Sequence, residues 1–441
     1  MPNQFTTSLW GDEAFSAILS MKSIPEIIKI ISRDTSPPLY NITEHLWFQI
    51  FGTSEVAIRT LSFLYFFLAV LFTYKIGALL FARKVGVLAA ILTFLNPFFF
   101  TYAFEGRMYS ILALGVTASM YFFLKQNWFL YILATAFALY SHHFAIFAVF
   151  VQGIWFLKEL LTNKDKKTSL FMFLSFVGVG ILYIPWLVPL YNQTKMVGSG
   201  FWLGTPTFVD LIKMLGDYLA RGIKHPLVTG ALVVTLAILV LRKWHKEVEK
   251  TLFLLSWFLL PILATWIISQ KFQSIFFNRY LLYTIPAAML ILASNTRKIL
   301  SLGLIAALVL LLSNIDYHYF THPTKRPFKD LATYVKETKR GDDILINWNA
   351  ASHHLWESKY YGIPAPIYLP EGKELPFFVG TALMVKEDII NEIPEKLPGK
   401  TKLQRVGVIT SGSVDEINLP NYTRKEVNVF GDLKFIWYAK K

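Results

Sequence analysis

The dominant pattern in this chain is a series of long apolar runs between residues 57 and 315. A helix needs about 20 mostly apolar residues to cross a bilayer, and ten runs approach or exceed that length. The runs at 127–141, 226–241 and 280–294 are the shortest, whereas 85–104 forms one continuous apolar stretch. The pattern therefore predicts a helical protein that crosses the membrane many times.

The segment before these runs is apolar but repeatedly interrupted. Residues 14–32 contain Lys22, Pro25, Glu26 and Lys29. Charged side chains are costly inside a bilayer, so this segment cannot serve as a span. We expect an amphipathic helix that lies in the membrane interface.

Beyond Tyr317 the composition becomes that of a water-soluble domain. A helix is predicted by the spacing of four apolar residues, Phe328, Leu331, Ala332 and Val335. Strands separated by turn residues are predicted for "GDDILINW", "APIYLP", "RVGVITSG" and "KFIWYAKK". These features predict a small α/β domain over 317–441.

Composition and charge agree with a membrane protein. Hydrophobic residues make up 54% of the chain and charged residues only 16%, with a mean hydropathy of +0.45. There is no cysteine, which excludes disulfides, thiolate metal sites and cysteine nucleophiles. Residues 1–315 carry 25 Lys/Arg against 13 Asp/Glu, whereas 316–441 carry 18 against 16. Because the basic excess lies among the apolar runs, it indicates contact with membrane lipids rather than with nucleic acid.

The basic residues also predict the orientation. Fourteen of them occupy alternate connections and are expected to face the cytoplasm: Lys75, Arg83, Lys84, Lys125, Lys158, Lys164, Lys166, Lys167, Arg242, Lys243, Lys246, Lys250, Arg297 and Lys298. This places the first loop (1–55) and the α/β domain outside the cytoplasm. Between them in the sequence lies a membrane bundle over 56–316. Met1–Trp10 shows no signal-peptide pattern that would export the first loop, so we expect that an upstream helix is missing from this sequence.

Seven motifs follow one another along nearly the whole chain: "SLWGDEAFS", "DTSPPLYNITEHLW", "FGTSEVAIRTLS", "FEGRMYS", "LYSHHFAIF", "NRYLLYTIP" and "RPFKDLATYVKE" with the "GDDILI" that follows it. Each motif is weak alone, but in this order the chain resembles glycosyltransferase family 39. The bacterial and archaeal members of that family are related to protein O-mannosyltransferases and aminoarabinose transferases, within the C-type membrane glycosyltransferase superfamily. The resemblance implies a polytopic C-type fold in a prokaryotic plasma membrane, and suggests that the missing helix is the first one of the family.

The resemblance also implies an activity. Such enzymes transfer a sugar from a polyprenyl-phosphate donor, with inversion, to a lipid, glycan or protein acceptor on the extracytoplasmic face. This chemistry needs a carboxylate to deprotonate the acceptor and cations to hold the departing phosphate. The predicted outer loops contain both kinds of residue.

Asp12 and Glu13 are the first candidates for the carboxylate. The resemblance makes Asp12 the general base. Glu13 either raises the pKa of its neighbour by charge repulsion or points away and caps the helix. The alternative is that Asp12 is only the N-cap of a helix starting near Ala14, a position that aspartate favours.

Glu105, Arg107, Arg279 and Tyr280 match polar positions of the family. Glu105 is expected to orient the acceptor or a metal, and Arg107 to bind a carboxylate or phosphate, although both could be interfacial anchors. Arg279 is the best candidate ligand for the donor phosphate, because its planar guanidinium matches phosphate oxygens; snorkelling to the interface is the alternative. Its neighbour Tyr280 either contacts substrate or serves packing. Lys224 could attract the anionic donor or a lipid headgroup.

The remaining candidates are histidines and one acid. His142 matches a family histidine and is predicted to bind substrate, with a plain interfacial role as the alternative. Asp34 either caps the helix that follows it or lines the donor site together with His45. His353 and His354 are predicted to lie on the surface of the α/β domain.

Two questions stay open at this level. No dedicated metal site is evident, although Asp12, Glu13 and Glu105 could hold a divalent cation. A transporter of polyprenyl phosphate or glycolipid would share the basic outer loops. It would also place charged residues deep within its spans, whereas the acids of this chain cluster at the predicted outer boundary.

Overall fold

The computed structural model describes residues 3–162, 166–221, 247–294, 299–348, 353–369, 374–393 and 405–441. The chain forms two compact units. The first combines Met1–Asp34, Asn41–Ile58 and His322–Lys441, and the second combines Thr35–Tyr40 with Arg59–Thr321. The first loop and the C-terminal domain, residues 322–441, therefore belong to one unit although they lie at opposite ends of the chain.

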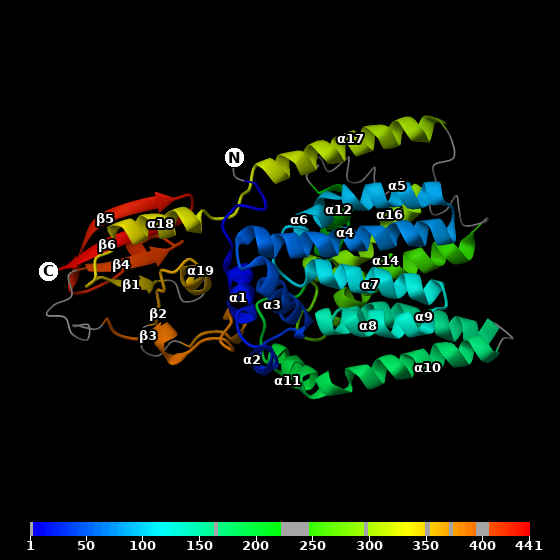
Figure 1. The fold of residues 1–441 in the computed structure, drawn as a ribbon, viewed down its shortest axis with the longest axis horizontal. Coiled ribbons are helices and arrows are strands. Elements are labelled where there is room, and N and C mark those ends of the chain that lie inside the picture. The colour runs from blue at the N-terminus through cyan, green and yellow to red at the C-terminus, as the bar shows by residue number, and fades with distance from the viewer. Residues whose placement is uncertain are drawn as a thin grey trace. The chain divides into compact units, whose positions relative to one another are not determined.

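Every regular element described in the second unit is a helix, and Figure 1 shows its long helices running roughly alongside one another. Its helices, with α4 beginning in the first unit, are α4 (Glu55–Leu80), α5 (Arg83–Phe94), α6 (Pro97–Tyr102), α7 (Tyr109–Leu124), α8 (Trp128–Ser141), α9 (Ala145–Thr162), α10 (Lys166–Tyr183), η1 (Ile184–Trp186), α11 (Leu187–Gly198), α12 (Phe208–Ala220), α14 (Val248–Ile268), α15 (Asn278–Leu281), η2 (Leu282–Thr284), α16 (Ile285–Ala293) and α17 (Ile299–Thr321).

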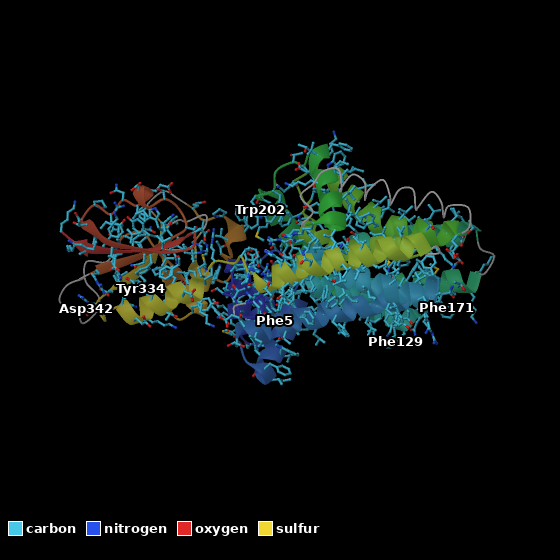
Figure 2. All side chains as sticks on the ribbon, turned by 90° about the horizontal axis from the view of Figure 1, so that it is seen from above. Phe5, Phe129, Phe171, Trp202, Tyr334 and Asp342 are labelled. Atoms are coloured by element: carbon cyan, nitrogen blue, oxygen red, sulfur yellow. The ribbon has the colours of Figure 1, made fainter. Side chains whose placement is uncertain are left out.

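Several of these helices have the length and composition of membrane spans. Within the described ranges, α4, α9, the continuous stretch Lys166–Gly198 and α14 are long and apolar enough to cross a bilayer, and α7 and α8 are shorter apolar helices. Large apolar side chains cover the outside of the unit, such as Phe129 at 69% exposure and Phe171 at 43% (Figure 2). Such exposure suits a lipid environment, so the prediction of a polytopic helical membrane protein is confirmed.

The structure differs from the predicted spans where proline intervenes. The run 85–104 is not one helix: α5 ends at Phe94, and Pro97 opens α6 as a first-turn residue. The Asn96 side chain caps α6 by accepting the Phe99 N–H at 3.0 Å. The run 280–294 is likewise divided into α15, η2 and α16, and the predicted span 226–241 lies outside the described residues.

Close packing of α7 on α8 positions the loops at their ends. A Cβ added to Gly115 would lie 2.8 Å from the Cα of Ala138, so only glycine permits this approach. The loop before α7 contains Glu105 and Arg107, and the loop after α8 contains His142. The two loops therefore keep a fixed spacing at one end of the helix pair.

In the first unit the N-terminal part forms α1 (Gly11–Ser20), α2 (Ile24–Ile31) and α3 (Leu39–Phe51). The first two residues of α3 belong to the second unit. The single amphipathic helix predicted over 14–32 is wrong, because the chain turns between α1 and α2. Ser23 is the N-cap residue of α2: its N–H and its hydroxyl both donate to the Glu26 carboxylate, at 3.1 Å and 2.6 Å, and Pro25 suits the first turn.

The C-terminal domain is a six-stranded sheet in the order β3-β2-β1-β4-β6-β5. Its elements are α18 (Phe328–Thr338), β1 (Ile344–Asn347), α19 (Leu355–Tyr360), β2 (Ile367–Tyr368), η3 (Phe377–Val379), η4 (Lys386–Asp388), β3 (Ile389–Ile390), β4 (Arg405–Thr410), η5 (Val414–Glu416), β5 (Tyr422–Phe430) and β6 (Leu433–Lys440). Strands β1 to β4 are parallel, and β6 pairs antiparallel with β4 and β5. The predicted α/β domain is confirmed, and the four buried apolar residues predicted on one helix face pack from α18 into its core.

One prediction for this domain is wrong. His354 is not on the surface but only 2% exposed. Its Nδ1 lies 3.1 Å from Glu357 Oε1 and its Nε2 lies 3.1 Å from Ser411 Oγ. These two polar partners allow the ring to be buried at the start of α19. Its neighbour His353 is half-buried.

Candidate active site

The acidic pair predicted as catalytic lies in the first turn of α1. The helix begins at Gly11, not near Ala14, and the Trp10 N–H donates to the Glu13 carboxylate at 3.3 Å. Asp12 is therefore inside the helix and is not its N-cap, so the capping alternative for Asp12 is wrong. Its half-buried carboxylate lies at the helix N-terminus, where the helix dipole favours negative charge.

Glu13 has a different environment from Asp12. Its side chain is fully buried, and its Oε2 accepts from Lys325 Nζ at 2.9 Å. The lysine is itself only 13% exposed. Glu13 therefore has two donors at one oxygen: the backbone at the start of its own helix and a cation from the C-terminal domain.

The other two candidates of the first unit, His45 and Asp34, lie on α3 and shortly after α2. His45, on α3, has its Nδ1 2.9 Å from the carbonyl oxygen of Ser20 at the end of α1. Asn41 contacts the same helix end through Ser16 and Ser20. Asp34 is buried directly after α2. His45 and Asn41 therefore attach α3 to the end of α1.

Three of the predicted residues line a cavity of about 450 Å³ in the second unit. Most of its wall is apolar, including Leu139, Phe147, Leu187 and Leu190. Its polar wall contains three of the predicted residues, Arg107, His142 and Tyr280, together with residues that were not predicted, including Thr35, His143, Tyr183 and Gln193. A cavity of this kind suits an amphiphilic ligand.

Arg279 lies beside this polar wall and is held by aromatic rings. Its guanidinium carbon is 4.7 Å from the ring centre of Phe277, 5.4 Å from that of Tyr109 and 5.9 Å from that of Tyr280. Tyr280 in turn packs on His142, with ring centres 4.8 Å apart. The rings restrict the orientation of the guanidinium, which favours directed hydrogen bonding to an anion.

The two adjacent histidines are kept neutral. Burial lowers the pKa of His142 well below its usual value, and the charges of His143, Arg107 and Arg279 lower it further. Burial also lowers the pKa of His143 to about 4, against a smaller opposing effect of Gln193. The His143 ring lies between Tyr183 Oη at 3.2 Å and Gln193 Oε1 at 2.7 Å. Positive charge at this wall therefore comes from the arginines.

A second polar group surrounds the Tyr102 hydroxyl. The charges of Glu105, Arg279, Arg221 and Asp217 all act on it, so each of these side chains lies within electrostatic range of Tyr102. Burial raises the pKa of Asp217. The sequence motifs indicated Glu105 and Arg279 but not Asp217. Lys224 lies outside the described residues.

No group of three or more His, Asp or Glu side chains is placed to hold a metal ion in the described part of the chain. The acids proposed as cation ligands are divided between the units: Asp12 and Glu13 belong to the first, and Glu105 to the second.

Comparison with known proteins finds one family model and several solved structures that are similar to this chain. Residues 35–188 match the family model described as dolichyl-phosphate-mannose-protein mannosyltransferase. Among solved structures, ArnT from Cupriavidus metallidurans in the apo state aligns with a TM-score of 0.68 at 12% identity, over 99% of this chain and 93% of ArnT. The same protein bound to undecaprenyl phosphate gives a TM-score of 0.66 at 11% identity, over 98% and 94%. No curated protein sequence matches the chain.

The family model matches the N-terminal part of the chain, whereas the structural likeness extends over nearly all of it, including the C-terminal domain. The resemblance to glycosyltransferase family 39 is thus confirmed over residues 35–188, and the chain is a helical membrane protein that has the fold of ArnT.

Proposed function

We propose that this protein transfers a sugar from a polyprenyl-phosphate donor to an acceptor hydroxyl or amine on the extracytoplasmic face of a prokaryotic plasma membrane. The observation that carries the proposal is the cavity of about 450 Å³, whose apolar wall continues into a polar wall containing Arg107. An isoprenoid phosphate has the same two parts, a long apolar chain and an anionic head. The binding of undecaprenyl phosphate by ArnT, which shares the fold, supports this choice of ligand.

The arginines supply the charge that the leaving group requires. When the bond between the anomeric carbon and the phosphate oxygen breaks, negative charge grows on the phosphate. Arg107 and Arg279 carry fixed positive charge, and Arg279 has its guanidinium oriented by three rings. Donors that are already oriented stabilise the developing charge without reorganisation, which is the main source of rate in such steps.

The remaining step is removal of the acceptor proton. We assign it to Asp12, which is half-buried in the first turn of α1 and is not used for capping that helix. Its carboxylate takes the proton as the acceptor oxygen or nitrogen attacks the anomeric carbon from the face opposite the phosphate. The products are the glycosylated acceptor, with inverted configuration, and the free polyprenyl phosphate.

The test is a transfer assay with purified protein in lipid vesicles and synthetic polyprenyl-phosphate sugars. Wild-type protein should release polyprenyl phosphate and form glycosylated acceptor in equal amounts. Asp12→Asn should still bind donor but turn over about 100-fold to 10,000-fold more slowly, the usual cost of losing a general base.

Asp330→Asn is the matched control, because Asp330 is an exposed acid in the first turn of α18. It should leave turnover unchanged. Turnover of Asp12→Asn within a few-fold of wild type would remove Asp12 from the mechanism. Absence of release from every polyprenyl-phosphate sugar by the wild-type protein would contradict the proposed function itself.

A further inference from the structure

The C-terminal domain contacts α1 at both sides of Asp12. On the side that follows Asp12, Glu13 is fully buried and bound to Lys325 Nζ at 2.9 Å, as described above. Two residues further along, the Phe15 ring meets the Trp356 ring edge-on, with ring centres 5.3 Å apart. Helix α1 thus packs against α19 of the C-terminal domain through this aromatic contact, and the buried ion pair joins it to the segment that precedes α18.

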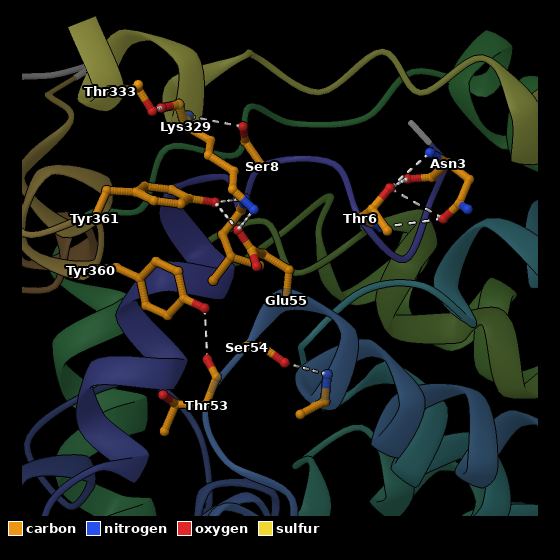
Figure 3. A network of polar contacts seen from close by, with 12 residues as sticks. Asn3, Thr6, Ser8, Thr53, Ser54, Glu55, Lys329, Thr333, Tyr360 and Tyr361 are labelled. Carbon is orange, nitrogen blue, oxygen red and sulfur yellow. Dashed lines mark hydrogen bonds and ion pairs between the residues drawn. The ribbon is translucent and has the colours of Figure 1, made fainter. Parts of the chain in front are cut away.

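On the side that precedes Asp12, the contacts are hydrogen bonds. The Leu9 N–H donates to the Tyr361 hydroxyl at 2.8 Å, and the Ser8 hydroxyl accepts the Lys329 N–H at 3.0 Å. The Tyr361 hydroxyl also donates to Glu55 at 3.1 Å, and Lys329 Nζ lies 3.3 Å from the same carboxylate (Figure 3). The segment that enters α1 is therefore joined to two elements of the C-terminal domain.

The start of α1 is also fitted closely to α19. A Cβ built on Gly11 would stand 3.5 Å from both carboxylate oxygens of Glu357, which is ordinary contact distance. Glu357 is only 4% exposed and contacts His354, which reaches Ser411 directly after β4. The surface that receives α1 is thus connected by side chains to the central sheet and is not a mobile loop.

We propose that the C-terminal domain is a positioning element for the catalytic carboxylate, and that Lys325 is its principal positioning residue. Through Glu13, Lys325 fixes the first turn of α1 and so the direction of the Asp12 side chain. Glu13 then serves as the receiving group for Lys325 and does not contact substrate. This inference rests on the proposed role of Asp12, because a base acts only when it is held in line with the acceptor proton.

The test compares Lys325→Met with Lys325→Arg. Methionine keeps much of the length of the side chain but removes its charge, whereas arginine restores a cation that can reach Glu13. Hydrogen–deuterium exchange of the amides in residues 11–20 should become faster in Lys325→Met and stay near the wild-type rate in Lys325→Arg. In the transfer assay, Lys325→Met should lower kcat by about tenfold to 100-fold with the donor KM within about twofold of wild type, because misplacing a catalytic group by about 1 Å costs on this order.

Arg326→Met is the matched control. Arg326 is the next residue, and its ion pair with Asp432, at 2.7 Å, lies within the C-terminal domain at 43% and 56% exposure. It should change neither the exchange of α1 nor kcat. If Lys325→Met leaves exchange in α1 unchanged, or if Arg326→Met lowers kcat equally, the positioning role is wrong.

Removal of Lys325 leaves a buried carboxylate without its cation and could prevent folding. Tyr361→Phe provides the second variant, because it keeps the ring but removes the hydroxyl that binds Leu9 and Glu55. It should also raise exchange at the start of α1 and lower kcat more than it changes the donor KM. Hydrogen–deuterium exchange is measured without substrate, so it reports on the positioning role alone. A failure of the proposed glycosyl transfer would instead appear as an inactive wild-type protein.

Discussion

Acidification should destabilise the second unit through His143, and the structure gives the size of the effect. The imidazole lies between Tyr183 and Gln193, and its burial lowers its pKa from 6.5 to about 4. The folded protein thus binds a proton there more weakly than the unfolded chain does. Stability is therefore complete above about pH 6.5 and is lost as the pH falls toward the folded-state value.

One pKa unit corresponds to about 1.36 kcal/mol, so the shift at His143 amounts to at most about 3 kcal/mol when the pH has fallen to about 4. This is a sizeable fraction of the 5–15 kcal/mol that typically separates folded from unfolded protein. The pKa of His142 is also lowered by burial, so part of the acid sensitivity will remain when His143 is replaced.

His143→Gln tests this reasoning, since glutamine can still hydrogen-bond to Gln193 but does not titrate. Thermal unfolding of purified protein in detergent, followed by tryptophan fluorescence between about pH 7 and about pH 4, should show a loss of stability that is smaller in the variant by up to about 3 kcal/mol. His318→Gln, at an exposed histidine of α17, should behave like wild type. Identical pH profiles for His143→Gln and wild type would refute the calculation.

Two other predictions address the site and its orientation. Arg279→Lys keeps the charge but loses the planar guanidinium that three rings orient, so donor affinity should fall by about tenfold. Donor KM measures the affinity, and the yield in membranes should show that folding is retained. An unchanged donor KM would contradict the phosphate role. A reporter enzyme that works only outside the cytoplasm should be active when fused after Lys441 and silent when inserted at Lys164, and the reverse pattern would overturn the assignment of the site to the outer face.

Sequence patterns predicted most of the elements because each depends on local information. The apolar runs and the spacing of Phe328, Leu331, Ala332 and Val335 follow directly from burial in lipid or in a core. Where the prediction was wrong, a short-range effect was underestimated: Pro97 ends a span, and Ser23 begins a new helix. The edge strand β5 was missed because most of its residues are exposed and polar, and such a composition does not show the apolar alternation that predicts a strand.

The site was harder to predict because its partners are distant in sequence. His143 and Gln193 are separated by 50 positions, and no local motif indicates that they form a hydrogen bond. The burial of His354 depends on Ser411, 57 positions away, whereas an adjacent pair of histidines suggests a polar surface. Motifs identified the residue types needed for the chemistry, but contacts such as these come only from the folded structure.

The joining of the two chain ends in one unit has a consequence for biosynthesis. Glu13 and Lys325 are 312 positions apart, so the ribosome must complete every membrane helix before the lysine exists. Until then, the first loop has been made but its buried carboxylate has no cation, and α1 cannot adopt its final state. The acidic helix can therefore reach its final state only after the helices that end at Thr321 have been made, and a nascent chain released before Lys325 would leave Glu13 without this partner.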